Sequence, residues 1–251
     1  MQSVDQLCDQ LASGDQVQAY QARRALDQLT ASVGGPDKTT QRGEIAAALA
    51  RALTAVNESK DGQGRPVSSP KYPSEVRSRL ARTLADVAGD MEVPALAQAL
   101  GSFETREMAR WALDRMTCQA ATDALVEAAQ KAVGDEFRVG CINALARRKS
   151  SAIVEVLKQF ALETNRDVRM AAAEALAEQA DAGADPAIAA AAAGAPPRGR
   201  DRVIRARIRL AENLVRAGEK DAGKDIYEAV AAGDCRDAQK KAAKIGLEQL
   251  G

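Results

Sequence analysis

The chain has 251 residues, of which 46% are apolar but only 3% aromatic, and its 35 lysines and arginines balance its 35 acidic residues. A compact globule of this length usually buries more aromatic area, so a core of Ala, Leu, Val and Ile favours closely packed helices. A net charge near zero argues against a protein that coats nucleic acid, and the absence of histidine excludes His-ligated metal sites and Ser-His-Asp or Cys-His catalysis.

Apolar residues recur at helical spacing along most of the chain and predict pairs of helices. Gly, Ser, Asn and Asp stand between these segments, where helices stop and are capped. In chain order, the predicted helices are 4–12, 16–30, 39–56, 74–88, 91–101, 103–116, 120–133, 135–148, 151–163, 166–180, 185–193, 200–216, 220–232 and 237–250. They make about seven pairs, and no alternating run of strand length predicts a sheet. Residues 58–72 are rich in Gly, Ser and Pro and are predicted to be a long mobile loop.

Four of the second helices open with one short motif: an acid, any residue and an arginine, with a leucine two helical turns later. The arginines recur about every 30 residues, which is typical of helical repeats. The acids and arginines are Glu75 and Arg77, Glu104 and Arg106, Glu136 and Arg138, and Asp167 and Arg169. Because a lone helix pair cannot bury its apolar stripe, we expect an all-α fold: one right-handed α-solenoid domain of stacked antiparallel pairs over residues 1–251.

The motif also suggests a role for its two charged residues. The acid stands at a helix start, where it favours the positive end of the helix dipole and can accept unpaired N–H groups. The planar fork of the arginine can reach the acid or a turn carbonyl of the adjacent repeat. We therefore expect Arg77, Arg106, Arg138 and Arg169 to form a structural ladder with their acids. Ligand binding by these arginines is the alternative.

These helices resemble the second helices of HEAT repeats, in particular the bacterial HEAT-like repeats similar to those of phycobilin lyases. The segments that carry the resemblance are SEVRSRLARTLADVA, FETREMARWALDRMT, DEFRVGCINALARRK and RDVRMAAAEALAEQA, within residues 73–182. The resemblance implies an armadillo-like helical fold with second helices on the concave face. It says little of function, because HEAT-like proteins include scaffolds, transport receptors, bilin lyases, DNA glycosylases and an iron-dependent hydroxylase. The His-Glu iron ligands of the hydroxylase are absent here.

One aromatic residue stands out on the predicted second helices. Trp111, the single Trp of the chain, falls outside the apolar stripe of its helix, so it is a candidate contact for a partner. The alternative is packing on a neighbouring second helix or on residues 58–72. The equivalent outward positions are Arg82, Asn143 and Glu174. This mixed row forms neither the continuous basic groove that nucleic acid needs nor the carboxylate pair of a hydrolase.

The pair 185–217 is rich in arginine. Four arginines share one side of its second helix, and they are Arg202, Arg205, Arg209 and Arg216. Such a stripe can clamp phosphates or an acidic protein segment. The alternative is a solvated face countered by neighbouring acids such as Glu178, Asp181 and Glu212. Arg207 falls on the buried side of the helix and is expected to pair with an acid.

The function predicted from these features is that of a non-catalytic scaffold, which binds a protein or peptide with an acidic segment on its concave surface. The alternatives are nucleic-acid binding of the HEAT-like DNA glycosylase kind, and a lyase- or chaperone-like role on a tetrapyrrole or other ligand. No cofactor or metal is expected, and we expect a monomer.

The cysteines and the N-terminus bear on the compartment. The four cysteines form no CxxC and are expected to be buried apolar residues in a reducing compartment, with a disulfide or a reactive thiol as the alternative. No segment is apolar enough to span a membrane, and the first residues lack the features of a secretory signal. A cytoplasmic protein is therefore expected, although a signal removed from the chain would not be visible.

Overall fold

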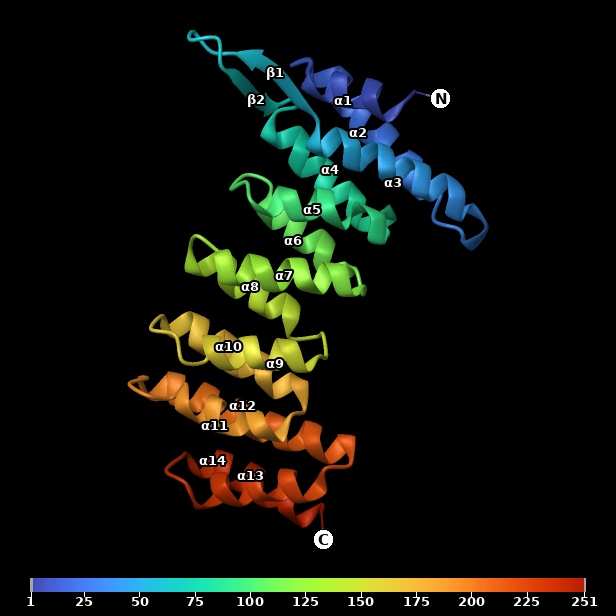
Figure 1. The fold of residues 1–251 in the computed structure, drawn as a ribbon. Helices are drawn as coiled ribbons and strands as arrows, with labels where there is room; N and C mark the ends of the chain where they lie inside the picture. The colour runs from blue at the N-terminus through green and yellow to red at the C-terminus, as the bar shows by residue number, and fades with distance from the viewer. Residues whose placement is uncertain (1, 251) are drawn as a thin grey trace. The chain divides into compact units, whose positions relative to one another are not determined.

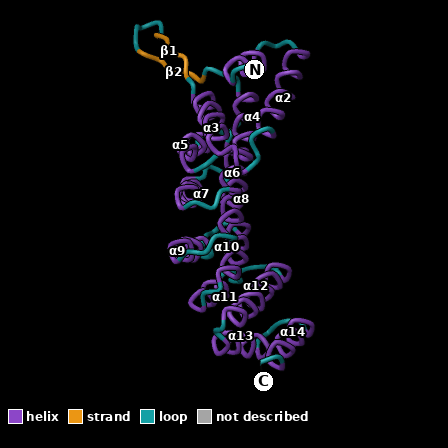
Figure 2. The backbone as a smooth tube through the Cα atoms, turned by 90° about the vertical axis from the view of Figure 1, so that its right-hand side faces the viewer, coloured by secondary structure: helices purple, strands orange, loops and turns teal. Residues whose placement is uncertain are grey.

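The computed structural model describes residues 2–250, which are mostly helical (Figures 1 and 2). Fourteen α-helices, three short 3-10 turns and one β-hairpin make up the regular structure of this range. The predicted all-α class is confirmed. The chain divides into two compact units, residues 1–128 and 129–251, and the boundary falls inside α7 (Gln119–Lys131). The single domain over residues 1–251 stays a prediction.

The first unit contains three antiparallel helix pairs. Its helices are α1 (Val4–Ala12), α2 (Gln16–Ala31), α3 (Thr39–Thr54), α4 (Ser74–Val87), α5 (Val93–Leu100) and α6 (Arg106–Arg115), followed by the start of α7. The first helices α1, α3 and α5 contact one another in turn, and so do the second helices α2, α4 and α6. Stacking buries at least one leucine of each pair completely, for example Leu26, Leu49 and Leu113. Burial of one such side chain contributes about 1.5–3 kcal/mol.

In the second unit, too, successive second helices contact one another. Its helices are α8 (Asp135–Leu145), α9 (Ser151–Phe160), α10 (Arg166–Gln179), α11 (Asp185–Ala190), α12 (Pro197–Ala217), α13 (Lys220–Ala232) and α14 (Asp237–Glu248). Helix α10 contacts α8, α9, α11 and α12, while α12 also contacts α13 and α14. Most of α10 is buried, including a run of alanines from Ala171 to Ala173. Small side chains let several helices approach one helix closely, which explains a core with few aromatics.

Local chemistry sets the ends and the close contacts of these helices. The carboxylate of Asp15 caps α2 by accepting the backbone N–H groups of Val17 and Gln18. Helix α12 ends at Gly218, whose φ of 94° is the left-handed conformation that favours glycine. At Gly246 a Cβ would lie 2.5 Å from the ring of Tyr227, so α14 packs on α13 only with glycine there.

Residues 56–70 overturn two predictions, the loop over residues 58–72 and the absence of a sheet. Strands β1 (Val56–Lys60) and β2 (Pro66–Pro70) form an antiparallel hairpin, in which Val56 lies opposite Pro70 and Lys60 opposite Pro66. In its turn, Oδ1 of Asp61 accepts the backbone N–H groups of Gln63 and Arg65. All ten strand residues are exposed, so no apolar face exists to give the sequence an alternating pattern.

The hairpin is tied to the first unit at its base. The Tyr72 ring is almost fully buried, and its hydroxyl donates to the carboxylate of Asp9 on α1 at 3.1 Å. Burial raises the pKa of the Tyr72 hydroxyl. Figure 1 shows the hairpin projecting beyond the helices that flank it. None of the helices in residues 2–250 is long and apolar enough to cross a membrane.

Candidate partner-binding surface

Arg169, the last motif arginine, hydrogen-bonds to the turns of two repeats. Its Nη1 donates to the carbonyls of Glu163 and Thr164 at 3.1 Å, in the turn that precedes α10. Its Nη2 donates to the carbonyl of Ala193 at 3.3 Å, in the turn between α11 and α12. The predicted reach to a turn carbonyl of the adjacent repeat is therefore present at this residue.

Arg138 has the same arrangement one repeat earlier. Its Nη2 donates to the carbonyl of Ala132 at 3.3 Å, in the turn before α8. Its Nη1 lies 3.8 Å from the carboxylate of Glu163 in the next turn, and its guanidinium lies 6.0 Å from the centre of the Phe160 ring. Arg138 thus joins α8 to the turn after α9.

The two motif arginines of the first unit have different surroundings. Arg77 is half-buried and lines a hollow of about 290 Å³ with residues of α3, the hairpin and α5. The guanidinium of Arg106 lies 4.5 Å from the centre of the Phe103 ring. The carbonyl of Glu104 accepts the hydroxyl of Ser78 on α4 at 2.7 Å, so this turn contacts α4 through its backbone.

The structure corrects the predicted capping role of the motif acids. At α10 the cap is Asn165, whose Oδ1 accepts the backbone N–H groups of Asp167 and Val168. Asp167 lies in the first turn, where a negative charge still favours the helix dipole, and Glu75 and Glu136 occupy the same place in α4 and α8.

Glu104 lies before the first residue of α6 and accepts the hydroxyl of Ser102 at 2.7 Å. This hydrogen bond holds the pKa of Glu104 below its usual value. At the α8–α10 step, the acid that joins two repeats is Asp135, which accepts Nδ2 of Asn165 at 2.7 Å. The motif acid beside it, Glu136, is exposed.

The candidate contact residues on earlier second helices are exposed to different degrees. Arg82 on α4 and Asn143 on α8 are exposed, as predicted from the helical wheel. Trp111 on α6 is half-buried, and the guanidinium of Arg115 lies 5.2 Å from the centre of its ring. Trp111 is thus neither a fully exposed anchor nor a core residue. A role for these three residues in binding stays a prediction.

Three of the four stripe arginines of α12 are paired with acids. Arg202 forms two hydrogen bonds with Glu174 on α10, at 2.8 and 2.9 Å, which raise the pKa of Arg202. Arg209 lies 3.1 Å from Glu178 on α10. Arg209 and Arg216 both lie near Glu212, at 3.6 and 3.7 Å. The alternative, in which neighbouring acids pair with the arginines, therefore holds for these three. Of the acids named for it, Glu178 and Glu212 are partners in the described ion pairs, and Asp181 is not.

Arg205 differs from its neighbours on the stripe, and Arg207 lies on the opposite side. Arg205 is exposed, and no acid of residues 2–250 lies within ion-pair distance of it. Arg207 forms two hydrogen bonds with Asp185 on α11, at 2.7 and 2.8 Å, and both side chains are mostly buried. The expected acid partner of Arg207 is thus confirmed.

Ion pairs between neighbouring second helices recur at four steps of the described chain, and most of them were not predicted from the sequence. In each pair the acid belongs to the earlier repeat and the arginine to the later one. The pairs are Asp27–Arg79, Asp86–Arg115, Glu174–Arg202, Glu178–Arg209 and Asp201–Arg236. The sequence separations of 28 and 31 residues at the α10–α12 step could have revealed it. Each pair has at least one partner that is exposed, so each contributes roughly 0.2–1 kcal/mol and favours register more than stability.

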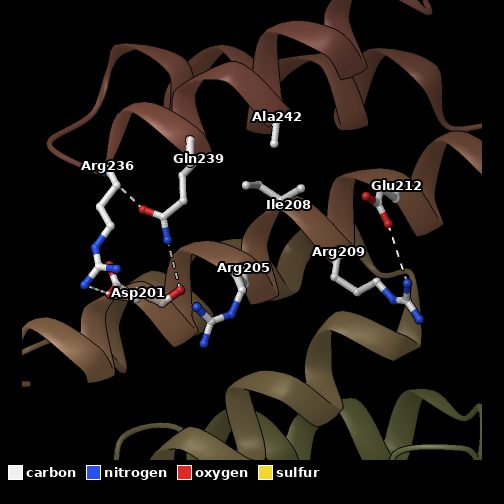
Figure 3. Close-up of a pocket in the computed structure, with 9 residues that line it drawn as sticks. Asp201, Arg205, Ile208, Arg209, Glu212, Arg236, Gln239 and Ala242 are labelled. Atoms are coloured by element: carbon white, nitrogen blue, oxygen red, sulfur yellow. Dashed lines mark hydrogen bonds and ion pairs between the residues drawn. The ribbon is translucent and has the colours of Figure 1, made fainter.

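A groove of about 480 Å³ separates α12 from α14 (Figure 3). At one end, Arg236 pairs with Asp201, and the side chain of Gln239 donates to the Asp201 carbonyl at 3.2 Å. The middle is apolar, with Ile208 on α12 facing Ala242 on α14 in Figure 3. The groove is therefore an open, partly apolar surface with charged residues along its α12 side.

A second hollow, of about 700 Å³, lies at the N-terminal ends of α10 and α12. Four arginines line it, and they are Arg166, Arg198, Arg202 and Arg236. Its remaining walls are Met170, Pro196, Pro197 and Gly199, so no acid lines this hollow. Within residues 2–250 no cluster of Cys, Asp and Glu is suited to hold a metal ion.

No family model matches the chain, and no curated protein matches it. Among solved structures it is similar to a chain of the CpcE–CpcF complex of phycocyanin lyase from a Nostoc species, with 18% identity, a TM-score of 0.44, and 100% of this chain and 96% of that chain covered.

Two further solved structures are similar to the chain. An archaeal HEAT-like repeats protein from Thermococcus onnurineus shows 14% identity and a TM-score of 0.43, over 100% of this chain and 97% of its own. Human deoxyhypusine hydroxylase shows 16% identity and a TM-score of 0.39, over 98% and 95%. The chain resembles HEAT-like repeat proteins. At such low identity and TM-score the likeness says nothing of residue roles.

Proposed function

We propose that the protein is a non-catalytic interaction scaffold that binds a segment of another protein along the second helices of residues 129–251. The observation that carries this proposal is the groove between α12 and α14. Its apolar middle, at Ile208 and Ala242, is bordered by charged side chains, which is the composition of a contact surface with a polar rim.

The pairing of the arginines favours this function over nucleic-acid binding. Affinity for nucleic acid depends largely on lysines and arginines that neutralise phosphates, and log affinity falls with log salt by about 0.9 per neutralised phosphate. Arg202, Arg209 and Arg216 are already paired with Glu174, Glu178 and Glu212. Among the four stripe arginines, Arg205 alone in the described structure has no acid within ion-pair distance. A stripe so countered offers a phosphate backbone few contacts.

Site-specific crosslinking tests the proposal. A photoreactive phenylalanine analogue at Ala242, in the groove, is compared with the same analogue at Ala229, an exposed alanine of α13 outside it. In host cells, we expect discrete crosslinked proteins from position 242 and none of them from position 229. The crosslinked protein is then purified, and its affinity for the scaffold is measured directly.

The purified pair decides the outcome. We expect Ala242→Arg to weaken binding at least about tenfold, as interface hot spots do, while Ala229→Arg leaves it unchanged. The same crosslinked proteins from both positions, or equal loss of affinity in both variants, would contradict a contact in the groove. An absence of crosslinks at position 242 would contradict it too.

A further inference from the structure

The hollow lined by four arginines collects the N-terminal ends of three helices. Arg166 is the first residue of α10, Arg198 lies in the first turn of α12, and Arg236 is the N-cap residue of α14. A helix N-terminus carries a partial positive charge, so a cation there is unfavourable. The sequence breaks this rule at three helix starts that line one hollow. Breaches of a local rule tend to mark functional sites.

The arginines of the hollow have unused donors. Arg202 and Arg236 are paired with Glu174 and Asp201. Arg166 donates two long hydrogen bonds, from Nε and Nη2 at 3.4 Å each, to the carboxylate of Asp167, and its side chain is 57% exposed. Arg198 is exposed, and no acid in the described part of the chain lies within ion-pair distance of it. The guanidinium of Arg198 and the Arg166 donors that do not reach Asp167 therefore remain for an outside anion.

The chemistry of the hollow matches carboxylates on a peptide. The molecule itself pairs arginine with carboxylate by two parallel hydrogen bonds, at Arg202–Glu174 and Arg207–Asp185. The hollow also adjoins the α12–α14 groove, because Arg236 lines both. A chain that places acidic residues near Arg198 can therefore place an apolar residue near Ile208.

We propose that this hollow binds an acidic segment of the partner protein, with its carboxylates on Arg198 and Arg166 and a following apolar side chain in the groove. This inference rests on the proposed scaffold function and adds the site at which an acidic segment binds and the residues that hold it. Arg198 and Arg166 then recognise the acidic segment. The stripe residues Arg202 and Arg209 do not, because they are already paired.

Peptide binding to the whole chain tests this proposal. The probe is a fluorescein-labelled peptide of alternating glutamate and serine with a leucine near one end, and its anisotropy is measured at low and moderate salt. A peptide with lysine in place of glutamate is the charge control, and a single-stranded oligonucleotide of similar length is the nucleic-acid control. We expect the glutamate peptide to bind, more weakly as salt screens the contacts, and the lysine peptide not to bind.

Two variants locate the binding. Arg198→Glu should weaken binding of the glutamate peptide at least about tenfold, because it replaces an attraction by a repulsion. The matched control is Arg200→Glu, an exposed arginine of the same helix that does not line the hollow. Glu174→Gln should tighten binding several-fold, because it releases the fork of Arg202 into the hollow. A damaged fold cannot produce such a gain.

Several results would overturn the proposal: no binding of the glutamate peptide, equal loss in Arg198→Glu and Arg200→Glu, or no gain in Glu174→Gln. Tighter binding of the oligonucleotide, with the same loss in Arg198→Glu, would overturn it in favour of nucleic acid. One further result separates the two proposals: the analogue at position 242 crosslinks a partner, and Arg198→Glu leaves the affinity for that partner unchanged. The scaffold function then stands and this assignment of the hollow fails.

Discussion

At the scale of single residues, Arg169 shows how the repeat motif acts. Arg169→Ala removes three hydrogen bonds from a charged donor to turn carbonyls of two repeats. We expect the free energy of unfolding to fall by about 1.5–3 kcal/mol, since bonds to charged groups contribute most and the carbonyls lose a partner. Urea denaturation measures the change. The slope of the unfolding free energy against urea concentration should be the same in the variant and the parent protein.

The control for Arg169→Ala is Arg166→Ala. Arg166 lies on the same helix but its side chain is 57% exposed, so we expect a change within about 0.5 kcal/mol. Equal losses in the two variants, or none in Arg169→Ala, would favour the alternative that the motif arginine binds a ligand.

The cysteines differ in reactivity because they differ in burial. Burial raises the pKa of the Cys8 thiol to about 12, whereas Cys118 and Cys235 are partly exposed. The thiolate is the nucleophile, so a raised pKa lowers the reactive fraction of Cys8 at any given pH. With iodoacetamide near pH 8.5, the free cysteine's usual pKa, we expect alkylation of Cys118 and Cys235 well before Cys8, as measured by peptide mass spectrometry.

Unfolding in urea provides the control for alkylation, because all four cysteines should then react alike. Labelling of Cys8 in the folded protein as fast as Cys235 would show that the α1 end of the first unit opens readily.

At the scale of elements, the sequence predicted the helices well and missed the hairpin, for one physical reason. A helix with one buried face repeats its apolar residues every three to four positions, and α1 and α13 have the predicted bounds. Strands β1 and β2 have no buried face, so apolar and polar residues need not alternate along them. The Asp61–Gly62–Gln63–Gly64 stretch was the available signal.

The candidate surface was harder to predict than the fold, because the role of a charged residue depends on its neighbours in the adjacent repeat. The helical wheel put Arg202, Arg205 and Arg209 on one side of α12 and left Arg207 on the buried side, as the structure has it. Glu178 was named as one acid that could counter the stripe, but the wheel could not show that Glu174 lies opposite Arg202 or which arginine Glu178 meets. The hollow at Arg198 requires three helix ends to meet, which no local pattern encodes.

The hairpin turn depends on the Asp61 carboxylate. Asp61→Ala removes the acceptor for the backbone N–H groups of Gln63 and Arg65. We expect faster amide hydrogen exchange in β1 and β2 by NMR and an unchanged melting temperature, because the strand residues are exposed and add little to the core. Asp61→Asn, which keeps a carbonyl acceptor but not the negative charge, is the control and should retain only part of the protection.

The pH dependence of the same turn has a definite sign. Hydrogen bonds from the Arg65 backbone and side chain lower the pKa of Asp61 from its ordinary value of 3.8. The stabilisation is therefore fully present above that ordinary value and is lost as the pH falls through the lowered one. The measurement is the protection factor of the hairpin amides, which is the exchange rate compared with the intrinsic rate of an unfolded chain at the same pH. Protection factors that are equal at neutral pH and at about pH 2–3 would contradict this role of the ionised carboxylate.

At the scale of the whole molecule, the two compact units share a helix, since the boundary at residues 128 and 129 falls inside α7. In a repeat array, stability is the sum of repeat terms and nearest-neighbour interfaces, so strong coupling makes the units unfold together. A helix interrupted in the middle loses hydrogen bonds in both halves. We therefore expect residues 1–251 to unfold in one cooperative transition.

The single Trp makes this prediction testable. Trp111 in α6 reports on the first unit alone, while far-ultraviolet circular dichroism reports on the helices of both. Leu176→Ala, in the core of α10, should destabilise the second unit by about 2–5 kcal/mol. With one cooperative array, the Trp111 fluorescence transition moves to lower urea together with the circular dichroism transition. A fluorescence transition left in place while part of the helical signal is lost early would instead show two domains that unfold independently.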